Sequence, residues 1–297
     1  MTGAPLISVV IPSYDARDTI RSCLGSVFDQ DCEARYEVIV VDSSGDGTDE
    51  IIRREFPQAL LFHLERRTPA GEARNLGMDK AAGDFVAFTD ADCMVARDWL
   101  SRILKRHQGG GYAAVGGSIA NGTPRSLVGS AEHLFAFNEF LPQAIEGLVT
   151  NIPTCNICYR RSALTGVRFK GGPDGVNLAE DLILNWSLTR RGEKLLFDPA
   201  IRVVHLNRTR LGVSLGHQYL LGQGSCWARK RTDIPGRIFV DYPVLGLATP
   251  FLRLARIVLR LSRIDRHAVL RFLALSPLIF LEASAWAAGF VREALRR

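Results

Sequence analysis

The first ninety residues alternate short apolar runs with stretches of helical periodicity. The apolar runs are rich in β-branched and aromatic residues and lack polar alternation, at 7–11, 37–41 and 84–88. Such runs are typical of strands that are buried on both faces of a sheet. The stretches between them place apolar residues at helical spacing, at 18–30, 48–56 and 71–82. Strands that alternate with helices predict an α/β fold, Rossmann-like, with a mostly parallel sheet and helices on both faces.

Polar side chains follow these strands at the points where the strands end. Tyr14 lies just past the first run, Asp42 past the second and Asp90 past the run at 84–88. In open α/β sheets, ligands bind outside the carboxyl ends of the strands. We therefore expect these side chains to lie along one edge of the sheet, around a bound ligand.

The segment Asp90-Ala91-Asp92 places two carboxylates two residues apart at the end of an apolar strand. The two charges repel one another, and a divalent cation removes that cost. Hard oxygen ligands suit Mg²⁺ or Mn²⁺, which in turn hold the oxygens of a diphosphate. The alternative interpretation is a solvated turn, or a helix cap before Trp99.

Other polar residues surround this segment. Asp42 can accept hydrogen bonds from a base or a ribose, although the Ser-Gly and Asp-Gly pairs behind it are also common in turns. Arg74, near the start of the stretch 71–82, can face a phosphate or a nucleobase, or can lie on the surface. Pro12 and Tyr14 follow the first strand and can pack against a base.

Five ordered stretches of the chain resemble family 2 glycosyltransferases of the GT-A fold, over roughly residues 6–205. They are SVVIPSYDARDTIRSCLGSVFDQ, YEVIVVDSSGDGT, GEARNLGMDKAAGDFVAFTDADC, NICYRRSAL and AEDLILNWSLTRRG. The resemblance implies a GT-A fold and an inverting enzyme that moves a sugar from a nucleotide diphosphate to an acceptor hydroxyl. In this family the nucleotide is most often uridine, so the resemblance implies a UDP-sugar as the donor.

The resemblance also implies the binding residues. Four residues would surround the nucleotide: Pro12, Tyr14, Asp42 and Arg74. Asp90 would contact the ribose or the metal, and Asp92 would be a metal ligand. His205 matches a position that sometimes supplies a further metal ligand, and Asn156 matches an asparagine beside the donor sugar.

The resemblance further implies that Asp181 is the general base. The metal would neutralise the charge that builds on the departing diphosphate. Asp181 would take the proton of the attacking hydroxyl, and a single displacement of this kind predicts inversion at the anomeric carbon. From the residues alone, a helix-capping role for Asp181 is the alternative.

The chain departs from the family pattern at three places. Ser43 stands where a second acid often follows the first nucleotide acid, and Ala179 stands where a glycine usually precedes the acidic pair. The Gln-x-x-Arg-Trp motif of processive synthases is absent, and His217-Gln-Tyr-Leu-Leu-Gly stands in its approximate place. This absence argues against a processive polysaccharide synthase.

The positive charge of the chain is concentrated at the C-terminal end. The formal net charge is +6, and residues 251–297 hold nine arginines and three acids. A nucleic-acid-binding domain usually spreads its basic residues over a folded face with aromatics between them. Charge within a hydrophobic tail indicates an anionic membrane surface instead. We therefore expect a membrane partner and no nucleic acid.

The stretch 240–262 is apolar and predicts an amphipathic helix. Its arginines recur at a spacing that places them on one helix face: Arg253, Arg256, Arg260 and Arg263. A helix of this kind is typical of a membrane interface. A basic helix that packs on the catalytic domain is the alternative.

The segment 272–291 is long enough to span a bilayer. Glu282 lies at its centre, where a charge costs about 2.5–3.5 kcal/mol on insertion scales, and Pro277 interrupts it. We expect a re-entrant or interfacial hairpin here, with a single transmembrane helix as the alternative.

These patterns divide the chain into a catalytic GT-A domain at 1–210 and a helical, membrane-associating region at 211–297. No secretory signal precedes the first strand, and the six cysteines are scattered. We therefore expect the catalytic domain on the cytoplasmic face of the cell membrane, where nucleotide sugars are made. This location suggests a saccharide or lipid-linked acceptor, a precursor of a lipid-linked or cell-surface glycan.

Two other functions compete with this one. A sugar nucleotidyltransferase also uses an α/β sheet and metal-binding acids, but its glycine-rich, basic phosphate loop is missing where Pro12-Ser-Tyr-Asp15 stands. A catalytically inactive membrane scaffold of the same fold is the second alternative. Loss of Asp92 or Asp181 would indicate such a scaffold, and both residues are present.

Overall fold

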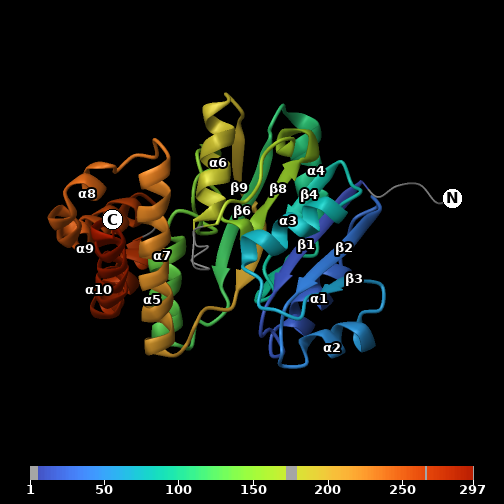
Figure 1. Cartoon of the computed structure of the whole chain (residues 1–297), viewed down its shortest axis with the longest axis horizontal. Helices are drawn as coiled ribbons and strands as arrows, with labels where there is room; N and C mark the ends of the chain where they lie inside the picture. Colours follow the sequence, from blue (N-terminus) through green and yellow to red (C-terminus); the bar gives the residue numbers. More distant parts are fainter. Residues whose placement is uncertain (1–5, 172–178, 265, 297) are drawn as a thin grey trace.

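The structure is a computed structural model that describes residues 6–171, 179–264 and 266–296. A sheet flanked by helices forms one lobe, and a cluster of C-terminal helices lies beside it (Figure 1). The strands of the described chain are β1 (Ile7–Ser13), β2 (Tyr36–Asp42), β3 (Leu60–His63), β4 (Phe85–Phe88), β5 (Cys93–Val95), β6 (Ala114–Asn121), β7 (Gly147–Val149), β8 (Ile157–Arg160) and β9 (Leu195–His205).

The helices divide between the two lobes. Those of the sheet lobe are α1 (Ile20–Phe28), α2 (Thr48–Glu55), α3 (Ala70–Lys80), α4 (Trp99–Gly109) and α6 (Glu180–Arg190), with the 3₁₀ turns η1 (Thr154–Asn156) and η2 (Arg161–Leu164). The second lobe contains α5 (Leu127–Phe137), α7 (Leu211–Arg231), α8 (Ile238–Asp241), η4 (Pro243–Ala248), α9 (Thr249–Ile264) and α10 (Arg266–Leu295).

The strands form one sheet in the order β3-β2-β1-β4-β8-β6-β9-β5, with β7 beside β9. The strands from β3 to β4 are parallel, as predicted. β8 lies antiparallel between β4 and β6, and β5 and β7 run antiparallel to β9. The α/β class is confirmed, and the sheet is mostly parallel as predicted, because β6 and β9 pair in parallel and run in the direction of β1 to β4. The antiparallel strands of the described sheet are β5, β7 and β8. A strand buried on both faces is apolar whichever way it runs, so hydrophobic pattern does not report its direction.

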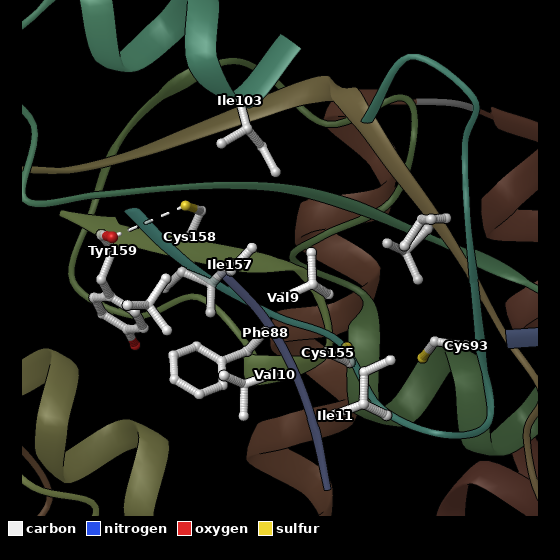
Figure 2. Packing of buried hydrophobic residues seen from close by; sticks show 14 of the residues in the cluster. Val9, Val10, Ile11, Phe88, Cys93, Ile103, Cys155, Ile157, Cys158 and Tyr159 are labelled. Atoms are coloured by element: carbon white, nitrogen blue, oxygen red, sulfur yellow. Dashed lines mark hydrogen bonds between the residues drawn. The ribbon is translucent and has the colours of Figure 1, made fainter. Parts of the chain in front are cut away.

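The core of the sheet lobe packs around its central strands. Figure 2 shows Val10 of β1 beside Phe88 of β4, in one cluster with Val9, Ile11 and Tyr159 of β8, and all five are buried. The rings of Phe88 and Tyr159 meet edge-on, with their centroids 5.9 Å apart. Full burial of such a side chain contributes about 1.5–3 kcal/mol. The strands are therefore a rigid support for the residues at their ends.

Helix α3 lies unusually close to β1. A Cβ atom at Gly77 would lie 2.3 Å from Cγ1 of Val10, so the approach requires glycine at this position. Arg74 lies one turn earlier on the same helix, and this packing brings it to the edge of the sheet where Asp90 follows β4.

The second lobe is a bundle of α7, α9 and α10 that also includes α5. Its core joins Phe135 of α5 to Trp286 of α10. Helices α7 and α10 cross so closely that a Cβ atom at Gly222 would lie 2.0 Å from the Trp286 carbonyl oxygen, and one at Gly289 would lie 1.9 Å from that of Tyr219. Because α5 precedes residue 211, the lobe is not built from the tail alone.

Helix α10 is continuous through Pro277, so the hairpin predicted for this segment does not form. Buried Glu282 faces the bundle, where its Oε1 accepts a 2.6 Å hydrogen bond from Ser214 Oγ of α7. Packing on α7, α9 and α5 supports the helix on both sides of the proline, which itself removes one helical hydrogen bond. By length and composition, the stretch His267–Leu295 is sufficient to cross a membrane.

Candidate active site

A cavity of about 880 Å³ lies between the two lobes. Residues that follow β1 and β4 line one part of it, and residues of α5, α7 and α9 line another. The sequence-predicted site residues in its lining are Pro12, Tyr14, Arg74, Asp90, Asp92, Asp181 and His205. A space of this size is typical of a site for a small molecule or cofactor. The structure thus brings seven of the nine predicted residues to one cavity.

Arg74 joins two carboxylates at the floor of the cavity. Its Nη2 donates a 2.7 Å hydrogen bond to Asp90 Oδ1, and its Nη1 donates one of 2.7 Å to Glu180 Oε1. The Arg74 side chain is only 5% exposed. Both terminal nitrogens thus position carboxylates, while Nε of Arg74 has no hydrogen-bond partner among the described residues. The nucleotide contact expected of Arg74 stays a prediction. Charge-assisted pairs of this kind hold both acids in fixed orientations.

Asp92 and His205 converge although 113 positions separate them in the chain. Strand β5 pairs with β9 so that Cys93 lies opposite His205, and this register places Asp92 Oδ1 3.7 Å from His205 Nε2. His205 Nδ1 lies 3.0 Å from Asn207 Oδ1, an amide oxygen that can only accept. Nδ1 therefore donates to Asn207, and Nε2 is the ring nitrogen that faces Asp92.

This arrangement fits a divalent metal. A carboxylate oxygen and an imidazole nitrogen 3.7 Å apart can share one ion, and an outer partner that fixes the histidine tautomer is usual at metal sites. Cys93 Sγ completes a group whose ligand atoms lie within 4.8 Å of one another. Burial raises the pKa of the Cys93 thiol, which keeps it protonated and a poor ligand. Asp90 points to Arg74 instead of joining this group.

Asp181 lies at the start of α6 and is partly exposed to the cavity. Its Oδ1 accepts a 2.7 Å hydrogen bond from the Leu182 backbone. Burial raises the pKa of Asp181; Arg74 opposes this shift and the charge of Asp90 adds to it. Its neighbour Glu180 is buried and paired with Arg74. Of the two acids, Asp181 is the more exposed to the cavity.

Ala179 explains how the acidic pair is presented. Its φ is +116°, in the left-handed region that favours glycine. This is the position at which the family pattern usually has glycine. The turn directs Glu180 into the floor and leaves Asp181 at the wall. A non-glycine residue held in such a conformation is typical of functional sites.

Pro12 of β1 and Tyr14, just past the end of that strand, both line the cavity. The Tyr14 ring is 44% exposed, and the guanidinium carbon of Arg67 lies 4.6 Å from its centroid. An exposed ring of this kind offers a flat surface for a nucleobase, consistent with the predicted role of both residues.

Asp42 does not line the cavity. Its side chain is fully buried, with Oδ1 accepting a 2.6 Å hydrogen bond from Ser44 Oγ and Oδ2 lying 2.8 Å from His63 Nδ1. Neither carboxylate oxygen of Asp42 is exposed, so in this structure Asp42 cannot make the direct contact with a base or a ribose that we predicted. The carboxylate instead holds the turn that follows β2, which is the turn chemistry that the Ser-Gly and Asp-Gly pairs also indicate.

Asn156 is also buried and does not line the cavity, so the structure does not bring its side chain to the predicted place beside a donor sugar. Its Oδ1 accepts a 2.8 Å hydrogen bond from Trp99 Nε1. Its Nδ2 donates to the carbonyl oxygens of Ser118 and Ile201, at 2.8 and 3.0 Å. Since all the polar atoms of this side chain are used inside the core, its role is to join α4, β6 and β9.

The basic face of α9 is turned in a direction that the sequence did not predict. Arg253, Arg256 and Arg260 line the cavity, so these arginines face the active site and not a membrane. The alternative, a basic helix packed on the catalytic domain, holds only in that the arginines face inward, because α9 packs on α10 and η4 of its own lobe. Apolar side chains of the same helix are exposed instead, among them Phe251 at 65% and Leu259 at 62%.

Several residues of the site were not singled out from the sequence. They are Arg67, Glu180, Asn207 and Gln218. Two carried a detectable signal, because Glu180 adjoins the predicted base and Asn207 lies two positions beyond the predicted metal ligand. No sequence pattern pointed to Arg67 or Gln218. Folding of the chain brings Arg67 to the Tyr14 ring and Gln218 to the cavity wall.

The family model for glycosyl transferase family 2 matches residues 8–167, more than half of the chain. Glycosyltransferase AglE of Haloferax volcanii is 29% identical over 227 residues, which cover 74% of this chain and 73% of that protein. The chain spans 61% and 62% of the length of two further curated relatives.

Two solved structures share the fold. One is a mannosyltransferase from Pyrobaculum calidifontis in complex with GDP-Man and Mn²⁺, with a TM-score of 0.65 and 21% identity, covering all of this chain and 89% of that one. The other is TarS of S. aureus in complex with UDP-GlcNAc, with a TM-score of 0.57 and 18% identity, covering 96% of this chain and 90% of that one. At these identities the likeness shows a GT-A-type fold. With the family match over more than half of its length, the chain belongs to glycosyl transferase family 2 and is a glycosyltransferase.

Proposed function

We propose that this glycosyltransferase moves a sugar from a nucleotide diphosphate to an acceptor hydroxyl, with inversion at the anomeric carbon. One observation carries the proposal: the Asp92–His205 pair and Asp181 line the same cavity. The first can hold the ion that a diphosphate leaving group requires, and the second can accept a proton. Both groups are therefore available to one bound donor and acceptor.

Asp92 and His205 are the proposed ligands of Mg²⁺ or Mn²⁺. When bound there, the ion neutralises the negative charge that develops on the departing diphosphate. Asp90, fixed by Arg74, keeps an oriented carboxylate beside the ribose or the ion. The Mn²⁺ complex of the Pyrobaculum mannosyltransferase supports this choice of ion.

Asp181 is the proposed general base. It takes the proton of the acceptor hydroxyl as that oxygen bonds to the anomeric carbon and the bond to the diphosphate breaks. A covalent intermediate would need a second carboxylate about 5–5.5 Å across the sugar. Arg74 engages one oxygen of Asp90 and one of Glu180 in ion pairs, which disfavours either acid as a nucleophile, so the proposal is direct displacement with inversion.

Tyr14 and Pro12 are the proposed platform for the nucleobase. The family resemblance favours a UDP-sugar, while one structural neighbour binds GDP-Man and another UDP-GlcNAc. Stacking on a ring accepts any base. Donors of both nucleotides therefore belong in the test.

The test is donor hydrolysis and transfer with UDP- and GDP-sugars in the presence of Mn²⁺. We expect turnover by the wild type, loss of turnover in Asp92→Ala, and donor binding without transfer in Asp181→Asn. Asp84 is exposed and lies at the opposite end of β4, so Asp84→Asn and Asp84→Ala are the matched controls and should retain activity. Equal turnover by wild type and Asp92→Ala would reject the metal assignment.

We further propose that the second lobe rests on the cytoplasmic face of the cell membrane through an apolar surface. The surface consists of exposed side chains from η4, α9 and α10: Val244, Leu247, Phe251, Leu259, Leu270 and Leu273. The rings of Phe251 and Phe280 lie 5.4 Å apart and join α9 to α10. Because α10 packs Glu282 into the bundle, contact with the interface accounts for this surface without a transmembrane span.

Vesicle flotation tests this contact. We expect the double change Phe251→Glu and Leu259→Glu to release the protein from anionic vesicles. Ile145 is 79% exposed and lies outside the apolar surface, so Ile145→Glu is the control that should stay bound. Flotation of the double variant at the wild-type level would show that another segment provides the anchor.

A further inference from the structure

We propose that Arg253 and Arg256 of α9 form a binding site for a phosphate group of the acceptor. This inference rests on the proposed function, because it places the acceptor in the same cavity as the donor. It adds the chemical class of the acceptor and the residues that recognise it. Arg253 forms no ion pair or hydrogen bond with any residue that the structure describes, although the charge of Glu139 acts on it.

Arg253 is a cation held between aromatic rings. Its guanidinium carbon lies 3.6 Å from the ring centroid of Trp286 and 5.1 Å from that of Phe135. It makes no hydrogen bond or ion pair with any residue that the structure describes. Burial lowers the pKa of Arg253 to about 9; the charges of Arg229 and Arg256 add to this shift, and the charge of Glu139 opposes it. The side chain therefore remains a cation at neutral pH, with its hydrogen-bond donors unused.

The other arginines of the cavity differ in this respect. Arg74 is paired with two acids, Arg208 with Glu132 at 2.9 Å, and Arg260 with Glu139 at 2.8 Å. Buried or confined charges in proteins are normally paired. Among the residues that the structure describes, Arg253 and Arg256 form no ion pair with an acid. They therefore give this cavity positive charge that a bound anion can pair with.

A second unused donor lies on the same cavity. Gln218 of α7 is 1% exposed, lines the cavity and has an Nε2 with no hydrogen-bond partner among the described residues. A buried amide donor without a partner costs about 1–3 kcal/mol, and a ligand oxygen would remove that cost. Two helices of the second lobe therefore contribute unpaired donors to one space.

Phosphate is the anion that these groups fit best. A guanidinium matches phosphate oxygens bidentately, and aromatic stacking orients its plane. The proposed metal site accounts for the phosphates of the donor on the sheet side of the cavity. The arginines come from the other lobe, so they are suited to a group on the acceptor. The opposite side of α9 exposes Phe251 and Leu259, where the chain of a lipid phosphate can continue.

Binding to vesicles that contain a long-chain isoprenoid phosphate provides the test, with vesicles that contain the matching neutral alcohol as reference. We expect wild type to prefer the phosphate, and Arg253→Gln to weaken that preference about tenfold, the effect of losing a charge-assisted hydrogen bond. Arg256→Gln provides a second variant at an exposed position if the first perturbs folding. Arg263 is on α9 but outside the cavity lining, so Arg263→Gln should bind as wild type does.

Soluble hexose phosphate and inorganic phosphate form the second arm of the experiment. If the two variants lose affinity equally for soluble phosphates and for vesicles, the result supports the site and identifies a free phosphate ester as its ligand. If they lose affinity for the vesicles alone, the ligand is a lipid phosphate. Unchanged affinity in both arms for Arg253→Gln and Arg256→Gln would overturn the proposal. Binding is measured without turnover, so Asp92→Ala should keep phosphate binding, and a failure of the proposed catalytic function would be seen separately.

Discussion

Arg74 of α3 donates a 2.7 Å hydrogen bond to Asp90, the first acid of the Asp-Ala-Asp segment. Through its other terminal nitrogen it reaches Glu180, 106 positions further along the chain. The residue that follows Glu180 is the proposed base. One guanidinium thus sets the spacing between the donor side and the acceptor side of the reaction.

Replacement of Arg74 by methionine should destabilise the protein strongly. Glu180 would remain buried without its partner, and breaking a buried pair in this way costs about 3–5 kcal/mol. Urea denaturation measures the change in the free energy of unfolding. Arg21→Met removes an ion pair of Arg21 that is half exposed, so it should change stability far less. If Arg74→Met and Arg21→Met lowered the free energy of unfolding by similar amounts, the ion pairs of Arg74 would not be the cause of the destabilisation.

Replacement of Asn207 by alanine should weaken Mn²⁺ binding by roughly 10–100-fold, as expected when the outer partner of a ligating histidine is lost. The alanine leaves His205 Nδ1 without its acceptor, so the tautomer and ring orientation are no longer fixed. Asn207→Asp keeps the acceptor and should retain most of the affinity. Electron paramagnetic resonance titration of free Mn²⁺ measures both. Wild-type affinity in the alanine variant would mean that His205 does not bind the ion.

The rate of transfer should rise with pH as Asp181 loses its proton. Burial raises the pKa of this carboxyl, against the opposing charge of Arg74, so the midpoint should lie above the ordinary value of about 3.9. A pH profile of kcat/KM measures the midpoint. Asp181→Asn should lose about 10²–10⁴-fold in rate and this acidic limb. If the acidic limb of the pH profile persisted unchanged in Asp181→Asn, it would report the titration of a group other than Asp181.

The stability of the helical lobe should fall as pH rises from about 4.3 to about 7. Burial raises the pKa of Glu282 to about 7, above the ordinary value of about 4.3, so the folded state binds its proton more tightly than the unfolded state does. The stabilisation from this proton is complete below the unfolded-state pKa of about 4.3, and it is lost as pH rises through the folded-state pKa of about 7. At higher pH the buried charge has only Ser214 as a hydrogen-bond donor among the described residues.

Glu282→Gln tests this dependence. The amide oxygen can still accept from Ser214, and the neutral side chain should be more stable than wild type at pH 8 and lack this part of the pH dependence. Urea denaturation at pH 5 and pH 8 measures the difference. Glu50→Gln changes an exposed acid of α2 and should leave the wild-type slope. If the free energy of unfolding of Glu282→Gln changed with pH as the wild type does, Glu282 would not be the source of the pH dependence.

Much of the sheet lobe could be predicted from local patterns. The strands from β1 to β4 and the helices between them follow from hydrophobic periodicity, which depends on neighbours within a few positions. The same patterns place Tyr14 and the Asp-Ala-Asp segment past strand ends, and both lie at the cavity. The membership of the family likewise rests on short ordered motifs.

The sequence by itself determined where strands, helices and strand-end acids lie, because these depend on short-range spacing. The tertiary structure alone decided the rest. It oriented β8, buried Asp42 and Asn156, and turned the α9 arginines toward the cavity. It also placed Glu282 against Ser214, 68 positions away. The physical reason is that the burial and pairing of a polar side chain depend on distant residues that meet it only when the chain folds.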